Sequence, residues 1–179
     1  MQFSGSYFEE LALRKELLLV GGVVLVLLFL ILATQFESLV QPLIIALTLP
    51  VGVLGALLAL YTSGATLNIV SIIGIIIMSG IDVNDAILKI DMINKGVQAG
   101  LPLEKAIMQG SERRLRPIMM TSLTTILAML PILFASGLGA EIQRPLAIAV
   151  IGGLTFGTIA SIMMVPMLYK ASYKISTSI

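Results

Sequence analysis

The residues that could do chemistry gather in one stretch, MSGIDVNDAILKIDMIN, at residues 78–94. It places Asp82, Asp85, Lys89 and Asp91 in a sequence that is otherwise almost continuously apolar. A charged side chain at the centre of a bilayer costs at least about 2.5 kcal/mol, so such residues are rare there and often mark proton or ion pathways. A proton relay is therefore the chemistry that this stretch predicts by default.

Three of these residues share one face of a predicted helix. At about 100° per residue, Asp82, Asp85 and Lys89 fall within about 60° of one another, and Asn84 neighbours their stripe just off its edge. Asp85 and Lys89 are four residues apart with the acid first, the order that favours an ion pair. We expect the stripe to face the interior of a helix bundle, because lipid would leave each group unpaired.

A structural interpretation fits part of the same stripe. Asp85 and Lys89 could form a neutralised pair near a helix end, with Lys89 extending to the membrane surface and Asp91 at the interface. Asp85 lies about one and a half turns further inside than Asp91, where a carboxylate is a proton-relay candidate.

Other chemistries find less support. An intramembrane aspartyl protease needs carboxylates on facing helices, whereas Asp82 and Asp85 lie on one helix. The 10 Met residues are better explained by packing than by a soft-metal path, since the chain has no Cys and no His. The sequence contains no phosphate-binding loop, metal-ligand cluster or catalytic triad. We predict that the protein is not an enzyme and that it uses no cofactor and no bound metal.

Membrane-spanning helices must position these residues. Of the 179 residues, 58% are hydrophobic and only 12% are charged, and the mean hydropathy is +1.05; a soluble domain of this length needs more polar surface. The net charge of +1 gives no argument for a nucleic-acid partner. The sequence predicts an all-α polytopic bundle embedded in a lipid bilayer, with five transmembrane helices. Their expected spans are 16–36, 42–60, 67–94, 117–136 and 145–169.

Three further segments complete the predicted organisation: a lead-in at 1–15, a loop at 95–116 and a tail at 173–179. The loop contains LPLEKAIMQGSERRLRP and predicts a short amphipathic helix on the cytoplasmic membrane surface. Pro117 and Pro145 are each expected where a span begins, because the missing N–H costs nothing there.

Basic residues predict the orientation. The loop at 95–116 and the C-terminal end carry 7 Lys and Arg residues (Lys95, Lys105, Arg113, Arg114, Arg116, Lys170, Lys174), against 3 on the other side (Arg14, Lys15, Arg144). Short loops rich in Lys and Arg stay in the cytoplasm. We therefore expect the N-terminus outside and the C-terminus in the cytoplasm.

Four sequence blocks, in order, resemble the C-terminal membrane half of the resistance–nodulation–division (RND) efflux permeases. They are ATQFESLVQPLIIALTLPVGVLGALLAL, GIDVNDAILKIDMIN, RRLRPIMMTSLTTILAMLPILF and GAEIQRPLAIAVIGGL. FSGSYFEE is similar to the end of the periplasmic domain that precedes the eighth of twelve family helices. The resemblance implies that the five spans are the last five of those helices, and that the chain is a fragment or a split gene product.

The resemblance also implies a function and a site. Such permeases export small molecules or metal ions in exchange for protons, which pass through charged groups on the fourth, tenth and eleventh helices. Asn84 and Asp85 stand where the tenth helix of drug exporters carries Lys and Asn, which leaves Asp85, with Lys89, as the titrating site. Arg114 and Thr121 match the Arg and Thr that the family uses beside the proton site. Asp82 is the weaker relay candidate, because it matches no family position and could simply contact water.

Partners and location follow from the same resemblance. It implies a homotrimer in the bacterial inner membrane, completed by the N-terminal helices and periplasmic porter domains, and working with a periplasmic adaptor and an outer-membrane channel. Two alternatives stay beside this interpretation. One is a heavy-metal cation exporter of the same superfamily, and the other is a membrane scaffold that transports nothing.

Overall fold

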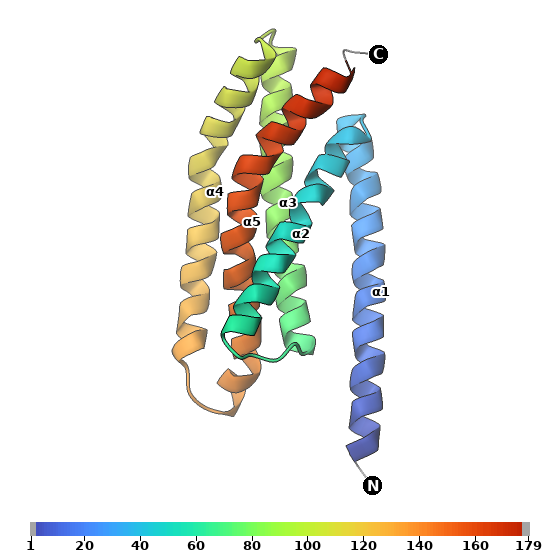
Figure 1. Ribbon diagram of the computed structural model, residues 1–179, viewed down its shortest axis with the longest axis vertical. Coiled ribbons are helices and arrows are strands. Elements are labelled where there is room, and N and C mark those ends of the chain that lie inside the picture. The colour runs from blue at the N-terminus through green and yellow to red at the C-terminus, as the bar shows by residue number, and fades with distance from the viewer. Residues whose placement is uncertain (1–2, 177–179) are drawn as a thin grey trace. The chain divides into compact units, whose positions relative to one another are not determined.

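The computed structural model describes the backbone of residues 3–176, and this part of the chain forms five helices and no strand (Figure 1). All five are long and apolar enough to cross a membrane. The predicted all-α fold with five transmembrane helices is therefore confirmed. The helices are α1 (Phe3–Phe36), α2 (Val40–Thr62), α3 (Ile69–Gln98), α4 (Leu103–Phe134) and α5 (Leu138–Ser176).

The chain divides into two compact units, Met1–Pro42 and Leu43–Ile179. The first contains α1, a single apolar helix that ends at Phe36, followed by Glu37 in the left-handed conformation with φ 49°. The second contains most of α2 and all of α3, α4 and α5. Every site described below lies within the second unit.

Helices α3 and α5 run in parallel within the second unit. Near their C-terminal ends the Tyr169 hydroxyl donates to Asn94 Oδ1 at 2.6 Å. Near their N-terminal ends a Cβ added to Gly74 would lie 2.9 Å from the carbonyl oxygen of Leu146. The pair thus keeps nearly the same register from one end to the other, and this register sets which α5 residues face the polar stripe of α3.

Helix α4 runs antiparallel to both. Gly110 packs on Ile93 of α3, since a Cβ added there would lie 2.8 Å from that side chain. Two buried hydroxyls, Ser122 Oγ and Thr158 Oγ1, lie 2.7 Å apart and join α4 to α5. Interhelical hydrogen bonds help to hold such helices together, because the hydrophobic effect does not drive helix association within lipid.

Helix α2 packs against α3 and α5 through small residues. A Cβ added to Gly52 would lie 3.4 Å from Gly157 Cα, and one added to Gly55 would lie 2.5 Å from Phe156 Cβ. The absence of these Cβ atoms lets the backbones approach closely, as small residues do in membrane bundles. The core beside this contact consists of Ala56, Leu60, Met78, Ala149, Val150 and Leu154.

The segment at 95–116 differs from its predicted form. It is not a separate surface helix: α3 continues to Gln98, a turn with Gly100 at φ 82° follows, and α4 begins at Leu103 and runs through Pro117. The physical reason is packing, because Ala106 is buried and a Cβ added to Gly96 would lie 3.1 Å from its Cβ. An amphipathic pattern predicts one apolar face, and here that face covers α3 instead of lipid.

The prolines differ in the same way. Pro117 and Pro145 lie inside α4 and α5 and do not begin them. Each removes one backbone hydrogen bond from its helix, and neighbouring helices or side chains make such breaks tolerable in membranes. For Pro117 the Thr121 hydroxyl supplies part of that replacement, since it donates to the Pro117 carbonyl at 3.1 Å.

Candidate proton-relay site

The polar stripe of α3 faces the interior of the second unit. Exposed fractions are only 3% for Asp82, 4% for Asp85 and 1% for Lys89. Met78 and Ser71 continue the same buried face toward the start of the helix. Asn84 is exposed, so the structure does not bring it into the stripe.

Lys89 reaches across to α5. Its ammonium donates to the backbone carbonyl of Ser161 at 2.8 Å. The interpretation in which Lys89 extends to the membrane surface is therefore wrong for this structure. Asp85 Oδ2 is buried and has no hydrogen-bond partner within the described chain. Asp85 and Lys89 thus share one face at i, i+4 while the ammonium is held by a backbone acceptor.

Asp82 lies between two glycines. A Cβ added to Gly52 of α2 would be 2.6 Å from Asp82 Oδ2, and one added to Gly157 of α5 would overlap the same oxygen. Both carboxyl oxygens are buried, and neither has a hydrogen-bond partner among the described residues. Asp82 therefore lies in the glycine cradle formed by Gly52 and Gly157, and not on an exposed surface of the described chain.

The glycines of α5 match the side chains of α3 turn by turn. Gly153 accommodates Met78, since an added Cβ would lie 2.5 Å from Met78 Sδ, and Gly157 accommodates Asp82. Both pairs are spaced four residues apart on parallel helices, so they stay in register. In this structure the GxxxG pattern of α5 makes room for two α3 side chains, one of them charged.

Arg114 and Thr121 take different positions on α4. Arg114 lies four residues after buried Gly110 and four before buried Ile118, so it belongs to the face that packs on the bundle. Its Nε is buried without a hydrogen-bond partner in the described chain. Antiparallel pairing of Gly110 with Ile93 places Arg114 level with Lys89.

Thr121 is exposed, and its hydroxyl donates to the Ile118 carbonyl at 2.9 Å as well as to that of Pro117. The Thr121 hydroxyl therefore bonds its own helix and not Asp85. A helical threonine hydroxyl commonly bonds a carbonyl three or four residues back, and this local bond takes precedence here.

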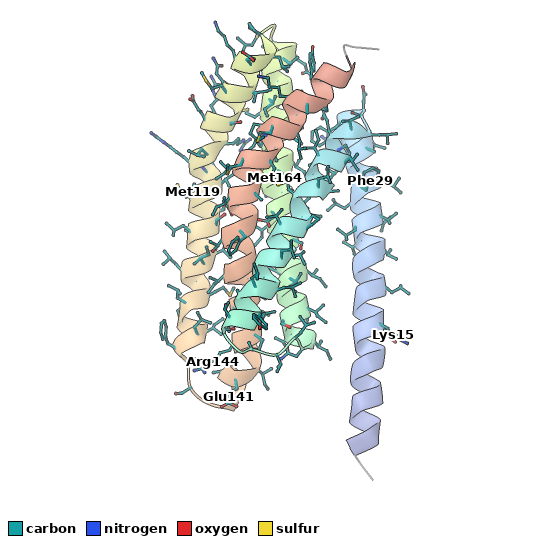
Figure 2. All side chains as sticks on the ribbon, in the orientation of Figure 1. Lys15, Phe29, Met119, Glu141, Arg144 and Met164 are labelled. Carbon is teal, nitrogen blue, oxygen red and sulfur yellow. The ribbon has the colours of Figure 1, made fainter. Side chains whose placement is uncertain are left out.

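Several other charges lie near the ends of helices. Asp91 pairs with Lys95 at 2.7 Å, both partly exposed. Glu141 and Arg144 lie where α4 passes to α5 (Figure 2), and Arg144 donates to the Ala135 carbonyl at 3.1 Å. Residues 38–81, 117–140 and 145–169 carry no charge. The stripe therefore places ionisable groups inside the helix bundle, and groups that can gain or lose a proton there suit a relay.

Sequence reasoning missed two parts of this site. The acceptor for Lys89 is a backbone carbonyl, which no residue type reveals, although Ser161 lies on the buried face of α5. Gly52 could be interpreted from the sequence only as a small residue that allows close helix approach, because glycines are common in membrane helices. The feature that marks Gly52 is a buried acid on one helix that faces glycines on two others. This feature can be recognised only once the register of the helices is known.

Comparisons with known proteins agree with this arrangement. Residues 1–172 match the AcrB/AcrD/AcrF family. The X-ray crystal structure of a heavy metal efflux pump, crystal form II, is 36% identical with a TM-score of 0.80, over 92% of this chain and 16% of that one. Crystal form I of a heavy metal efflux pump is 35% identical with a TM-score of 0.77, over 89% of this chain and 16% of that one.

These matches cover nearly the whole chain, while the chain spans only 16% of the pumps' own length. The helices that they align are the helices that carry the buried stripe and its glycine cradle. The chain belongs to the AcrB/AcrD/AcrF family, the resistance–nodulation–division efflux permeases that its sequence blocks resemble.

Proposed function

We propose that the chain is the C-terminal membrane portion of a proton-driven RND efflux transporter and that it contributes part of the proton relay. The observation that carries the proposal is the buried stripe of Asp82, Asp85 and Lys89, which lies beside uncharged stretches of α2 and α5 and has Arg114 of α4 level with Lys89. Burial of ionisable groups in a membrane is expensive and typically persists where protons or ions move.

Asp85 is the centre of the proposed relay. When ionised, it pairs with a cation, either Lys89 one turn away or Arg114 from α4. When protonated, it needs no cation, and Lys89 keeps the Ser161 carbonyl as its acceptor. A buried group whose partner changes with its charge is a two-state element, which proton-coupled conformational change requires. Thr121 and Asn84 have no direct part in this step, since both are exposed.

The rest of the transporter supplies what these five helices do not contain. We infer N-terminal helices, periplasmic porter domains and a homotrimeric assembly in the bacterial inner membrane, with a periplasmic adaptor and an outer-membrane channel. We assign 1–15 to the end of a periplasmic domain and the lead-in to the first span, and we assign the basic segment at 95–116 and the tail at 173–179 to the cytoplasm. The tail lies in part outside the described residues.

Cysteine labelling tests the orientation, because the native chain has no Cys. Lys105→Cys should react only with reagents that enter the cytoplasm, and Gly64→Cys should react from outside in intact cells. Labelling of position 105 from outside would overturn the orientation.

A heavy-metal cation exporter is the second candidate, and it draws on the description of the two similar structures, which are crystal forms of a heavy metal efflux pump. The discriminating measurement is resistance: cells that express the complete permease are challenged with divalent metal salts and, separately, with amphiphilic drugs. Protection against metals alone would select the second candidate.

Asp85→Asn in the complete permease tests the proposed function. The substitution keeps the shape of the side chain and removes its proton, so proton-gradient-driven export should be lost while expression and assembly persist. Asp91→Asn, on the same helix but paired with Lys95 near its end, is the matched control and should export normally. Normal export by Asp85→Asn would leave the scaffold as the better interpretation.

A further inference from the structure

Asp82 has an unusual environment for an acid. Its exposed fraction is 3%, and both carboxyl oxygens are buried without a hydrogen-bond partner in the part of the chain that the structure describes. Gly52 and Gly157 lie directly against its carboxyl group, and Met78 packs beside them; none of the three offers a side-chain donor. The carboxyl group therefore lies in a close-packed cradle whose side chains offer it neither a positive charge nor a hydrogen-bond donor.

The nearest cations are engaged or distant. Lys89 lies seven residues further along α3, about 10 Å along the helix axis, and its ammonium is held by the Ser161 carbonyl. Arg114 of α4 is level with Lys89, and α4 has no titratable residue after Arg116. Asp85, one turn away, adds a second acid and no positive charge.

The other two helices bring no charge to the cradle. Between Leu43 and Thr62 the only titratable residue of α2 is Tyr61, which is 85% exposed. Between 145 and 169 the only titratable residue of α5 is Tyr169, whose hydroxyl bonds Asn94 near the helix end. Among the described residues, no element packed against Asp82 therefore neutralises it.

An ionised carboxylate in this cradle would be a buried charge without a partner, which costs several kcal/mol. A protonated carboxyl avoids that cost because it is neutral. Resting on the proposed function, we propose that Asp82 is a second proton-binding carboxyl of the transport path, positioned by the glycine cradle one turn from Asp85. The path then uses two acids on one helix face.

The order of the two acids gives the step a direction. Asp82 precedes Asp85 by three residues, about 4.5 Å along α3, and lies toward the end that we place outside the cell. An entering proton reaches Asp82 first. Transfer then breaks the O–H bond of Asp82 and forms one on ionised Asp85, so that the negative charge moves from Asp85 to Asp82. A proton from outside neutralises Asp82 again.

Infrared spectroscopy of the complete permease in lipid tests this assignment. Protonated carboxyls give a carbonyl stretch that shifts in heavy water, and Asp82→Asn should remove one such band across a pH titration. Asp91→Asn should remove none, because Asp91 is paired with Lys95. An unchanged set of bands in Asp82→Asn, or a band that is lost when sodium is added at fixed pH, would overturn the proposal.

Transport separates this proposal from the function on which it rests. Asp82→Asn should fold, because an amide resembles the neutral carboxyl, yet it should lose proton-driven export. If Asp85→Asn abolishes export while Asp82→Asn keeps both its full band set and normal export, only the role of Asp82 fails. If both variants export normally under a proton gradient, the proposed function fails as well.

The glycine cradle provides an independent test. Gly157→Ala places a methyl group where Asp82 Oδ2 lies, so the Asp82 band should shift in frequency as the carboxyl leaves the cradle. Gly80→Ala on the same helix as Asp82 is the control, because no described atom lies within 4 Å of its added Cβ. An Asp82 band that is identical in Gly157→Ala and in the native permease would contradict the cradle.

Discussion

Charged side chains have opposite environments in the middle of α3 and at its C-terminal end. At the end, Asp91 pairs with Lys95 at 2.7 Å, and both side chains are partly exposed. The exposed pair of Lys170 in α5 with Glu104 in α4, also at 2.7 Å, is of the same kind. In the middle, Asp82 and Asp85 are almost fully buried and leave oxygens without partners. The same residue types are thus satisfied where water is near and unsatisfied where it is not.

This difference separates two roles for charge. Exposed ion pairs form easily and contribute little, so they need no function to explain them. Buried acids lower stability unless something compensates them, and sites that break a local rule in this way are commonly functional. The contrast between the two regions supports placing the relay in the middle of α3, and four substitutions examine it.

Lys89→Met should have the largest effect. It removes the buried ammonium and keeps a flexible apolar side chain, so Asp85 loses the cation beside it and the chain should lose about 3 kcal/mol of stability. Proton-driven export should also be lost. The stability is measured by denaturant unfolding of the chain in detergent micelles.

A double-mutant cycle identifies the cause of that loss. If Lys89 acts through the acid, Asp85→Asn combined with Lys89→Met should recover most of the stability that Lys89→Met removes. Simple addition of the two single effects would show that Lys89 acts through its bond to Ser161 alone.

Gly152→Ala ranks next and probes the packing that creates the cradle. Its Cβ would overlap Ala59 Cβ and lie 2.9 Å from the Gly55 carbonyl oxygen, so overpacking should cost about 2 kcal/mol. Gly80→Ala is the control, because its open site should leave stability equal or raise it by up to about 1 kcal/mol through helix propensity. Equal unfolding curves for the two variants would argue against a close α2–α5 contact.

The fold was predictable because its signals are periodic and long. Charge-free runs that match the bilayer thickness predict five helices, and all five helices of the structure are apolar enough to span one. The buried face of α3 was predictable for the same reason, since Asp82, Asp85 and Lys89 recur at helical spacing. The sequence predicted a surface helix within 95–116 and a separate span from 117, whereas the structure has one helix, Leu103–Phe134. The reason is that an amphipathic pattern does not say whether lipid or protein covers its apolar face.

The partners of the site were less predictable because they depend on register. Thr121 was placed beside Asp85 by family resemblance, yet buried Ile118 and Ser122 define a face of α4 that excludes it. The side of α4 that faces the bundle could be inferred from the spacing of its buried residues only after its apolar face had been assigned. A backbone acceptor such as the Ser161 carbonyl has no sequence signature at all.

Ser122→Ala should have a smaller effect than either substitution above. It removes the buried hydrogen bond between Ser122 and Thr158, 2.7 Å long, and interhelical bonds of this kind contribute about 0.6 kcal/mol in membranes. Ser79→Ala is the control, because the Ser79 hydroxyl bonds only its own helix at the Ile75 carbonyl. A loss near 3 kcal/mol would place Ser122 among the costly central groups.

Lys95→Gln should have the smallest effect and tests the opposite side of the comparison. Lys95 and Asp91 are an i, i+4 pair with side-chain exposures of 65% and 37%. Water screens such a pair, so its loss should change the unfolding free energy by about 0.3–0.5 kcal/mol, and high salt should remove even that difference. Proton-driven export by the complete permease should be unaffected, because Asp91 keeps access to water without its partner. A loss of export equal to that of Lys89→Met would mean that the relay extends to the end of α3. The distinction between paired ends and an unpaired middle would then no longer mark the functional residues.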